Sequence, residues 1–226
     1  MDGVAGTGIP LRSILEHGSH GLGTFRGMRG ELIAFDGEVW QMKHDGSVRR
    51  ADVSGADGED YSPFAMVTDF RAEHSGTATL SEKGGVEGVL AALAPDAHNT
   101  HIAFRLDGAF KRIRVRTAQG QCYEGEGLKD VASRQVEVTL PASRGTVVGF
   151  RSPQFLQGVV VAGVHMHYID DARTAGGHVL ALESDGEVKV QVAELWRTVM
   201  DLPRGDKAFN EAPLALNDGG IKAVEG

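Results

Sequence analysis

Three histidines close together in the last third of the sequence are the residues best suited to chemistry. His165 and His167 are separated by one residue, and His178 follows the pair Gly176-Gly177. In an extended strand, side chains two positions apart point to the same face and lie about 6.5 to 7 Å apart. Two imidazoles at this spacing can bind one ion, and neutral imidazole suits zinc.

The loop between His167 and His178 decides whether a third ligand joins the pair. Its ten residues are enough to return an antiparallel strand beside the first one, which would bring His178 to the same ion. Three protein ligands with open positions are typical of a catalytic zinc site. The competing interpretation is an accidental His-x-His pair, with each ring hydrogen-bonded to backbone or exposed. Since Cys122 is the single cysteine, no cysteine-rich structural zinc site competes.

The elements that must hold these histidines are expected to be mostly strands. Thirty-one glycines against seven prolines, with Asp-Gly pairs repeated between apolar stretches, indicate a chain that reverses direction by tight turns. We predict two-residue hairpins at three of these pairs: Asp36-Gly37, Asp107-Gly108 and Asp185-Gly186. Gln135–Leu140 alternates polar and apolar residues with period two, which predicts a strand with one solvent-facing side.

Helical signal is confined to two short segments. Pro10–His17 carries apolar residues at helical spacing behind a proline, and Val86–Ala94 is a second candidate that Pro95 ends. The length of 226 residues allows one large domain or two closely packed halves, and we expect two. Periodicity lapses around residue 120, so we divide the chain there into segments 1–120 and 121–226.

The overall composition excludes several classes of protein. Hydrophobic residues make up 41% and charged residues 24%, as in ordinary globular proteins. The net charge of −8, without a run of basic residues, argues against a nucleic-acid partner. No stretch of about 18 apolar residues is present, so we expect no membrane partner. The first residues lack the basic and apolar regions of a secretory signal, so we expect a cytoplasmic protein.

Three further motifs follow one another along nearly the whole chain: Gly21-Leu-Gly-Thr-Phe25 with Gly30-Glu-Leu32, Phe104–Gly108 with Arg114–Thr117, and Gly149–Pro153 leading to His178. They form a glycine-threonine-phenylalanine hairpin near the start, an arginine-rich strand in mid-chain, and a phenylalanine-serine-proline stretch before the histidines. In type, order and spacing these motifs resemble those of the acetolactate decarboxylase family.

The resemblance implies a fold and a set of site residues. It implies an α+β, predominantly β protein of two packed subdomains, an N-terminal mixed sheet and a C-terminal antiparallel sheet or barrel that carries the metal site. It also implies a homodimer whose N-terminal sheet runs across the interface. The three histidines would bind zinc, while Glu31, Arg116 and Glu225 would be catalytic. Arg116 and Thr24 would bind the substrate.

The reaction that the resemblance implies is the zinc-dependent decarboxylation of 2-acetolactate, a small keto acid, to acetoin and carbon dioxide. Loss of carbon dioxide leaves an electron pair beside a ketone, and a carboxylic acid must then deliver a proton. Glu31 and Glu225 are both candidates, and the sequence does not choose between them. Two other functions stay open: a zinc-dependent hydrolase with the same three histidines, and a non-catalytic metal-binding or oligomerisation module.

Overall fold

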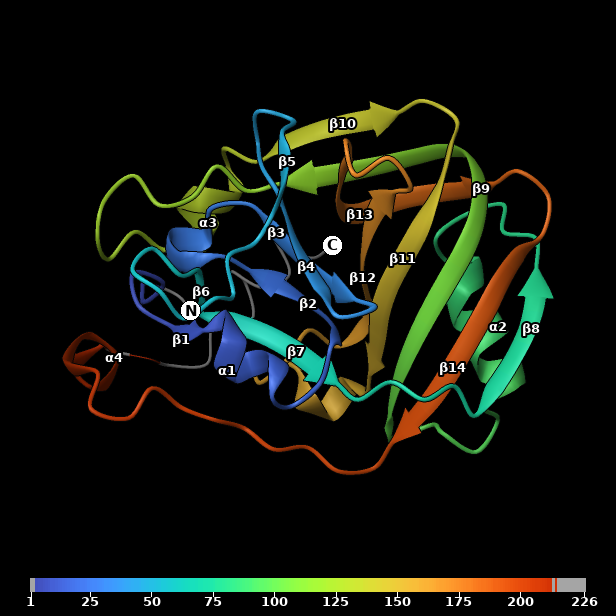
Figure 1. The fold of residues 1–226 in the computed structure, drawn as a ribbon. Coiled ribbons are helices and arrows are strands. Elements are labelled where there is room, and N and C mark those ends of the chain that lie inside the picture. Colours follow the sequence, from blue (N-terminus) through green and yellow to red (C-terminus); the bar gives the residue numbers. More distant parts are fainter. Residues whose placement is uncertain (1–2, 213, 215–226) are drawn as a thin grey trace.

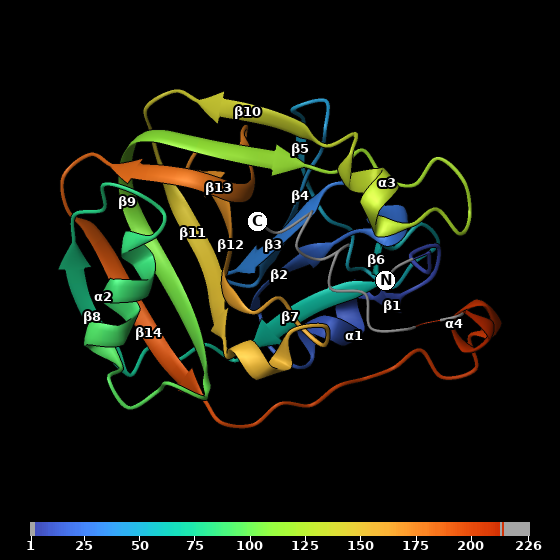
Figure 2. The ribbon, with the colours of Figure 1, turned by 180° about the vertical axis from the view of Figure 1, so that it is seen from behind.

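The structure is a computed structural model that describes residues 3–212 and 214. It is built mainly from two antiparallel sheets that pack against each other (Figures 1 and 2). The smaller sheet has five strands in the order β5-β4-β3-β2-β7. Their bounds are β2 His20–Thr24, β3 Glu31–Phe35, β4 Glu38–Met42, β5 Val48–Arg50 and β7 Phe64–Thr68.

The larger sheet has seven strands, and four of them close into a barrel. β11, β12, β13 and β9 pair in this order, and β9 pairs with β11 again, which completes the ring. The strands are β8 His74–Ala78, β9 His101–Thr117, β10 Val136–Leu140, β11 Ser143–Ser152, β12 Gly163–Asp170, β13 Gly176–Ser184 and β14 Val188–Leu195. The predicted strand at Gln135–Leu140 is therefore confirmed as β10.

Short helices and one small strand pair complete the described part. α1 Leu11–Leu15 and α2 Gly85–Leu93 confirm the two predicted helices. α2 lies beside β8 and β14 (Figure 2) and contributes two buried side chains to the barrel core. The others are α3 Leu128–Ala132, α4 Lys207–Glu211, the 3-10 helices η1 Arg26–Met28 and η2 Gln154–Leu156, and the paired strands β1 Ile9–Pro10 and β6 Tyr61–Ser62. Within this part, no helix has the length and apolar character needed to span a bilayer.

The first predicted hairpin is confirmed, and the second is wrong. Asp36 and Gly37 join β3 to β4, and both have the positive φ that this turn type needs. Asp107-Gly108, by contrast, lies inside the 17-residue strand β9. A side chain at Gly108 would place its Cβ 2.6 Å from Val188 Cγ1. This glycine therefore permits a close approach of two strands and does not turn the chain.

The third predicted hairpin, at Asp185-Gly186, is also wrong. β13 and β14 pair in succession with the same strand, β9, and not with each other. Asp185 donates its backbone N–H to Ala109 O at 2.8 Å, so the irregular residues between the two strands lie against the bend of β9 (Figure 1). Both Asp-Gly pairs thus lie where β9 bends at a corner of the barrel. They resemble hairpin turns in the sequence, but neither joins two strands that pair with each other.

The predicted fold class is confirmed, since the protein is predominantly β with few helices. The expectation of a mixed N-terminal sheet is wrong, because every pairing between strands of the described chain is antiparallel. The chain passes from the smaller to the larger sheet between β7 and β8, ahead of residue 120, the predicted domain boundary. The division into two domains stays a prediction.

Hydrophobic clusters fill the barrel and join it to the smaller sheet. The barrel cluster combines side chains of all four barrel strands with Val86 and Leu90 of α2. A second cluster packs Ile33 and Met42 of the smaller sheet against Val148 and Ile169 of the barrel. Because apolar contacts fix the two sheets relative to each other, side chains that face the space between them are held in place from both sides.

Candidate metal centre and its pocket

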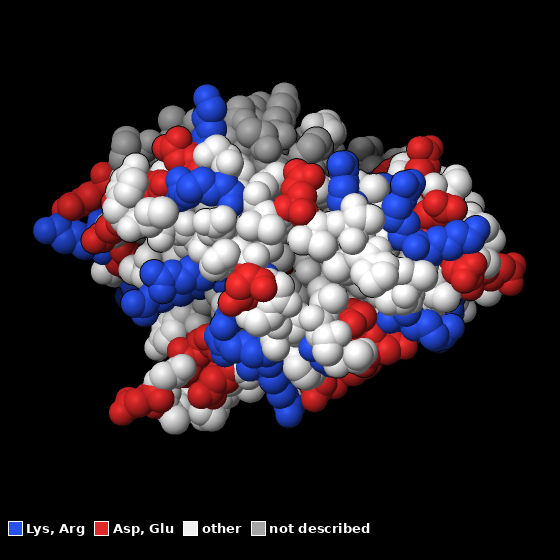
Figure 3. Space-filling view, turned by 90° about the horizontal axis from the view of Figure 1, so that it is seen from above, with Lys and Arg blue, Asp and Glu red and all other residues white. Residues whose placement is uncertain are grey.

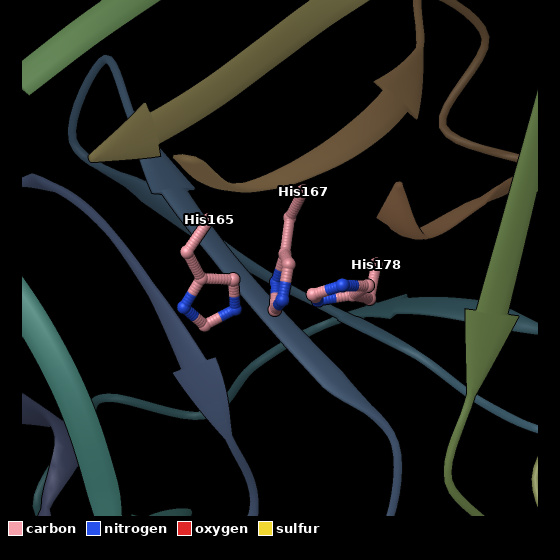
Figure 4. Close-up of side chains that lie close together, drawn as sticks. All are labelled: His165, His167 and His178. Carbon is pink, nitrogen blue, oxygen red and sulfur yellow. The ribbon is translucent and has the colours of Figure 1, made fainter. Parts of the chain in front are cut away.

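The three predicted histidines meet on one face of the barrel wall. His167 on β12 stands directly opposite His178 on β13, and His165 lies two residues earlier on the same face of β12. One ring nitrogen from each residue can be chosen so that all three lie within 4.8 Å of one another. The ring centroids are 5.0 to 5.4 Å apart, and Figure 4 shows the three rings side by side. The prediction that these histidines converge is confirmed.

Burial keeps two of these rings, His165 and His178, neutral. None of the three side chains exposes more than 4% of its surface. Desolvation is the main cause that lowers the pKa of His165 to about 3 and that of His178 well below its usual range, and the charge of Arg116 acts in the same direction. A neutral imidazole has a lone pair to offer, so His165 and His178 have the protonation state that a divalent metal ion requires of its ligands.

The smaller sheet orients one of the rings. His167 donates its Nδ1–H to the carbonyl oxygen of Leu32 on β3, at 2.7 Å. This bond fixes the tautomer with a lone pair on Nε2, in the manner of the outer hydrogen bonds that support metal-binding histidines. The chemistry of the three rings therefore fits a metal ion such as zinc, bound by nitrogen.

The glycine pair before His178 allows β13 to approach its neighbours. At Gly176 a Cβ would lie 2.5 Å from Met42 Sδ, and at Gly177 it would lie 2.7 Å from Arg116 O. Gly177 also has a φ of +152°, which residues with side chains rarely adopt. Glycine at both positions therefore lets His178 reach the other two rings.

A buried carboxylate and a buried guanidinium lie next to the histidines. Arg116 on β9 is the register partner of His178, and its Nη1 lies 3.3 Å from Glu31 Oε1. The same oxygen accepts the N–H of Ala118, and Glu31 Oε2 lies 3.5 Å from His167 Nε2. Glu31 and Arg116 expose only 5% and 3% of their surfaces. The structure thus brings both predicted residues to the three-histidine cluster.

A pocket of about 130 Å³ opens at this cluster. His165, His167, Glu31, Arg116 and Thr24 line it, and the Thr24 hydroxyl donates to Gly30 O at 2.7 Å. The remaining predicted residue, Glu225, lies outside the described residues.

Sequence reasoning missed the rest of the pocket wall. Its apolar part comes from η1, β7, α3 and the loop before β12, and Gln135 adds a polar group: the residues are Met28, Phe64, Leu128, Val131, Gln135 and Val159–Val161. They belong to separate segments with no shared spacing, so no pattern in the sequence could have grouped them.

The fold and the site define a mostly β protein with a buried three-histidine centre that fits a metal ion. The family model described as Alpha-acetolactate decarboxylase matches residues 1–216. The chain is 36% identical over 228 residues to the Alpha-acetolactate decarboxylase of Raoultella terrigena, covering 100% of this chain and 85% of the relative. It is 32% identical over 231 residues to that of Bacillus licheniformis, covering 100% and 87%.

Solved structures agree with these relatives. The crystal structure of alpha-acetolactate decarboxylase from Bacillus subtilis strain 168 has a TM-score of 0.88 at 28% identity and covers 100% of this chain and 94% of that one. The chain therefore belongs to the alpha-acetolactate decarboxylase family, as its motifs predicted, and it is a carboxy-lyase.

Proposed function

We propose that this protein decarboxylates 2-acetolactate to acetoin and carbon dioxide with a zinc ion at His165, His167 and His178. The observation that carries the proposal is the convergence of three buried imidazoles beside a buried Glu31–Arg116 pair at one small pocket. The names of its relatives supply the substrate class, and the pocket suits a small ligand with both apolar and polar groups.

The three histidines would hold the zinc ion, and the rest of the pocket would hold the keto acid. When bound, zinc supplies a Lewis acid that polarises the ketone and stabilises negative charge on its oxygen. Burial in the barrel keeps His165 and His178 neutral, and the smaller sheet orients His167 through the carbonyl oxygen of Leu32.

Arg116 would position the substrate. A guanidinium only donates hydrogen bonds, and its planar fork matches a carboxylate or a pair of oxygens. Its burial beside Glu31 holds the fork in one orientation, which fixes the direction from which the carboxylate leaves. The apolar wall around it excludes water, which strengthens these hydrogen bonds.

A protonated carboxylic acid would complete the reaction by delivering a proton to the carbon that has lost carbon dioxide. Glu31 is the candidate within the described chain, because it lies in the pocket and contacts both Arg116 and His167. Glu225 keeps the same proposed role, and the two single variants Glu31→Gln and Glu225→Gln separate them. The true donor's variant should still release carbon dioxide from substrate but protonate the product slowly and with less stereochemical control.

The decisive experiment combines metal analysis with product detection. The purified protein should contain about one zinc per chain, and racemic acetolactate should give acetoin and carbon dioxide in equal amounts. Cleavage of esters or amides without carbon dioxide release would favour a hydrolase. Bound zinc without any exchangeable solvent ligand would favour a structural module. Homodimer formation through the smaller sheet stays a prediction, which light scattering in solution would check.

A further inference from the structure

We propose that Gln135 recognises the hydroxyl group of the substrate and thereby selects 2-hydroxy-3-oxo acids. This inference rests on the proposed function, since it names the substrate group to which one pocket residue forms a hydrogen bond. Gln135 lines the pocket together with Arg116 and His165. It directly precedes β10, whose first residue, Val136, pairs with Thr117 of β9. The side chain thus extends from the residue just before the strand that pairs with β9, the strand that carries Arg116.

The amide of Gln135 has one satisfied end and one unsatisfied end. Its Nε2 donates to Glu137 Oε1 at 3.3 Å, whereas its Oε1 is buried and accepts no hydrogen bond from any residue that the structure describes. A buried carbonyl oxygen without a donor is unfavourable and uncommon in proteins. At the wall of a ligand pocket, the ligand is the natural source of the missing donor.

Glu137 fixes which end of the amide faces inward. Its carboxylate is partly exposed and lies 3.8 Å from Arg114 Nη1 on the neighbouring strand. If the Gln135 amide were turned around, its oxygen would lie against this carboxylate, and two acceptors would repel each other. The NH₂ group therefore stays on the Glu137 side, and the carbonyl oxygen stays on the buried side.

The chemistry of the substrate leaves one group that can meet this oxygen. A 2-hydroxy-3-oxo acid has a carboxylate and a ketone, which only accept hydrogen bonds, and a single hydroxyl, which can donate. Arg116 is a pure donor and suits the two acceptors, whereas Gln135 Oε1 is a pure acceptor and suits the hydroxyl. A 3-oxo acid with a methyl group at this position would leave the Gln135 oxygen unpaired, so the site should reject it.

Two unreactive acids that differ only in this group provide the test. 2-Hydroxy-2-methylpropanoate and 2,2-dimethylpropanoate are titrated calorimetrically into the zinc-loaded protein, and the ratio of their affinities measures preference for the hydroxyl. Gln135→Met keeps the length of the side chain and removes the acceptor. We expect the ratio to fall about 5- to 10-fold, the effect of one neutral hydrogen bond. The affinity for the dimethyl acid should not fall, because methionine leaves no acceptor unpaired beside its methyl group.

Two further variants make the result specific. Glu137→Ala frees the amide without touching the pocket and, being a change at a partly exposed residue, should fold normally. We expect it to lower the ratio in the same direction but less. Gln154→Met, a matched change at an exposed glutamine, should leave the ratio unchanged. A full hydroxyl preference in Gln135→Met would overturn the inference, whatever Glu137→Ala shows.

The same protein samples also separate this inference from the proposed function. Zinc content and acetoin formation from acetolactate are measured for each variant. Acetoin formation by the unaltered protein with an undiminished hydroxyl preference in Gln135→Met would refute the role of Gln135 alone. Absence of acetoin formation by the unaltered protein would refute the proposed function. The ratio of the affinities for the two acids would still show whether Gln135 binds a hydroxyl group.

Discussion

At the scale of single residues, the candidate metal centre depends on rings that come from two strands, and a third strand supports one of these rings. His167 contributes one ring, and its Nδ1 bond to Leu32 ties that ring to the smaller sheet. Replacing His167 with alanine removes one of three proposed ligands. In metalloproteins, loss of a hydrogen bond that only supports a ligand already lowers metal affinity about 10- to 100-fold, so loss of a ligand itself should cost at least as much. We expect zinc content and turnover to fall together in His167→Ala, as metal analysis and acetoin assays would measure. Full activity in a chelated sample of this variant would contradict zinc catalysis.

Arg116 should behave differently, because it lies beside the cluster and is not one of its proposed ligands. Arg116→Ala removes the fork that positions the carboxylate, and we expect turnover to fall by about 100-fold or more with zinc content almost unchanged. Arg114→Ala, at an exposed residue two positions earlier on β9, is the matched control and should keep both. Because Arg116→Ala leaves Glu31 buried without its cation, the free energy of unfolding of this variant should also fall by about 3 kcal/mol. Equal loss of zinc and turnover would assign Arg116 a structural role.

His20 provides a prediction about pH. It is buried, stacked on Phe70 and donates Nε2–H to Phe104 O, and burial lowers its pKa from 6.5 to about 4. Between pH 6.5 and 4, the unfolded chain binds a proton at His20 and the folded chain does not, so stability falls as the pH is lowered. Below about pH 4 both states are protonated, and the loss ends.

The measurement compares the free energy of unfolding at pH 7.5 and pH 4 in the unaltered protein and in His20→Phe. The variant lacks the titrating ring, so the unaltered protein should lose about 3 kcal/mol more over this range. The other buried histidines contribute to both proteins and cancel in the difference. Equal pH dependence of the two proteins would show that His20 keeps an ordinary pKa.

At the scale of elements, close strand contacts depend on missing side chains. Gly149 on β11 faces Phe104 on β9, and a Cβ at this position would lie 2.2 Å from the phenylalanine ring. We expect Gly149→Ala to destabilise the fold by about 1 to 3 kcal/mol through overpacking. Gly88→Ala is the matched control, because this glycine is exposed in α2 with no atom near a new Cβ. It should stabilise by about 0.5 to 1 kcal/mol. Urea unfolding of both variants measures the contrast.

Comparison of the elements with their sequence signals shows what local patterns can decide. The period of two in His165-Met-His167 is a property of any strand, so it predicted the shared face correctly. The signal at Asp36-Gly37 predicted a hairpin correctly because the two flanking strands pair with each other. The same signal at Asp107-Gly108 and Asp185-Gly186 misled, since β9 bends there and supplies a common partner for both β13 and β14. Strand partners are a tertiary property that a dipeptide does not encode.

At the scale of the whole molecule, the site is shared between the two sheets. The three histidines belong to the barrel, whereas Glu31 and the Leu32 carbonyl belong to the smaller sheet. On the face seen in Figure 3, acidic and basic side chains alternate without a large patch of one sign. On this face no charged patch would attract a small anionic substrate, whereas Arg116 supplies a cation in the pocket.

The last prediction concerns cooperativity between the sheets. If the cluster of Ile33, Met42, Val148 and Ile169 makes them one unit, zinc bound by the barrel must also stabilise the smaller sheet. Trp40 on β4 reports on the smaller sheet, provided that the exposed Trp196 is replaced by phenylalanine. Zinc at about 1,000 times its dissociation constant would contribute about 4 kcal/mol if it binds only the folded state. For a chain of this size, that corresponds to about 10 °C in the midpoint of thermal unfolding.

Chelation should therefore lower the unfolding midpoint seen by Trp40 fluorescence and the midpoint seen by far-ultraviolet circular dichroism by the same amount. Ile169→Ala, which opens a cavity between the sheets, should lower both midpoints together as well, with a loss of about 2 to 5 kcal/mol. If chelation moved the circular dichroism transition and left the Trp40 transition in place, the two sheets would be independent domains. The orientation of His167 by Leu32 would then be too weak to couple them.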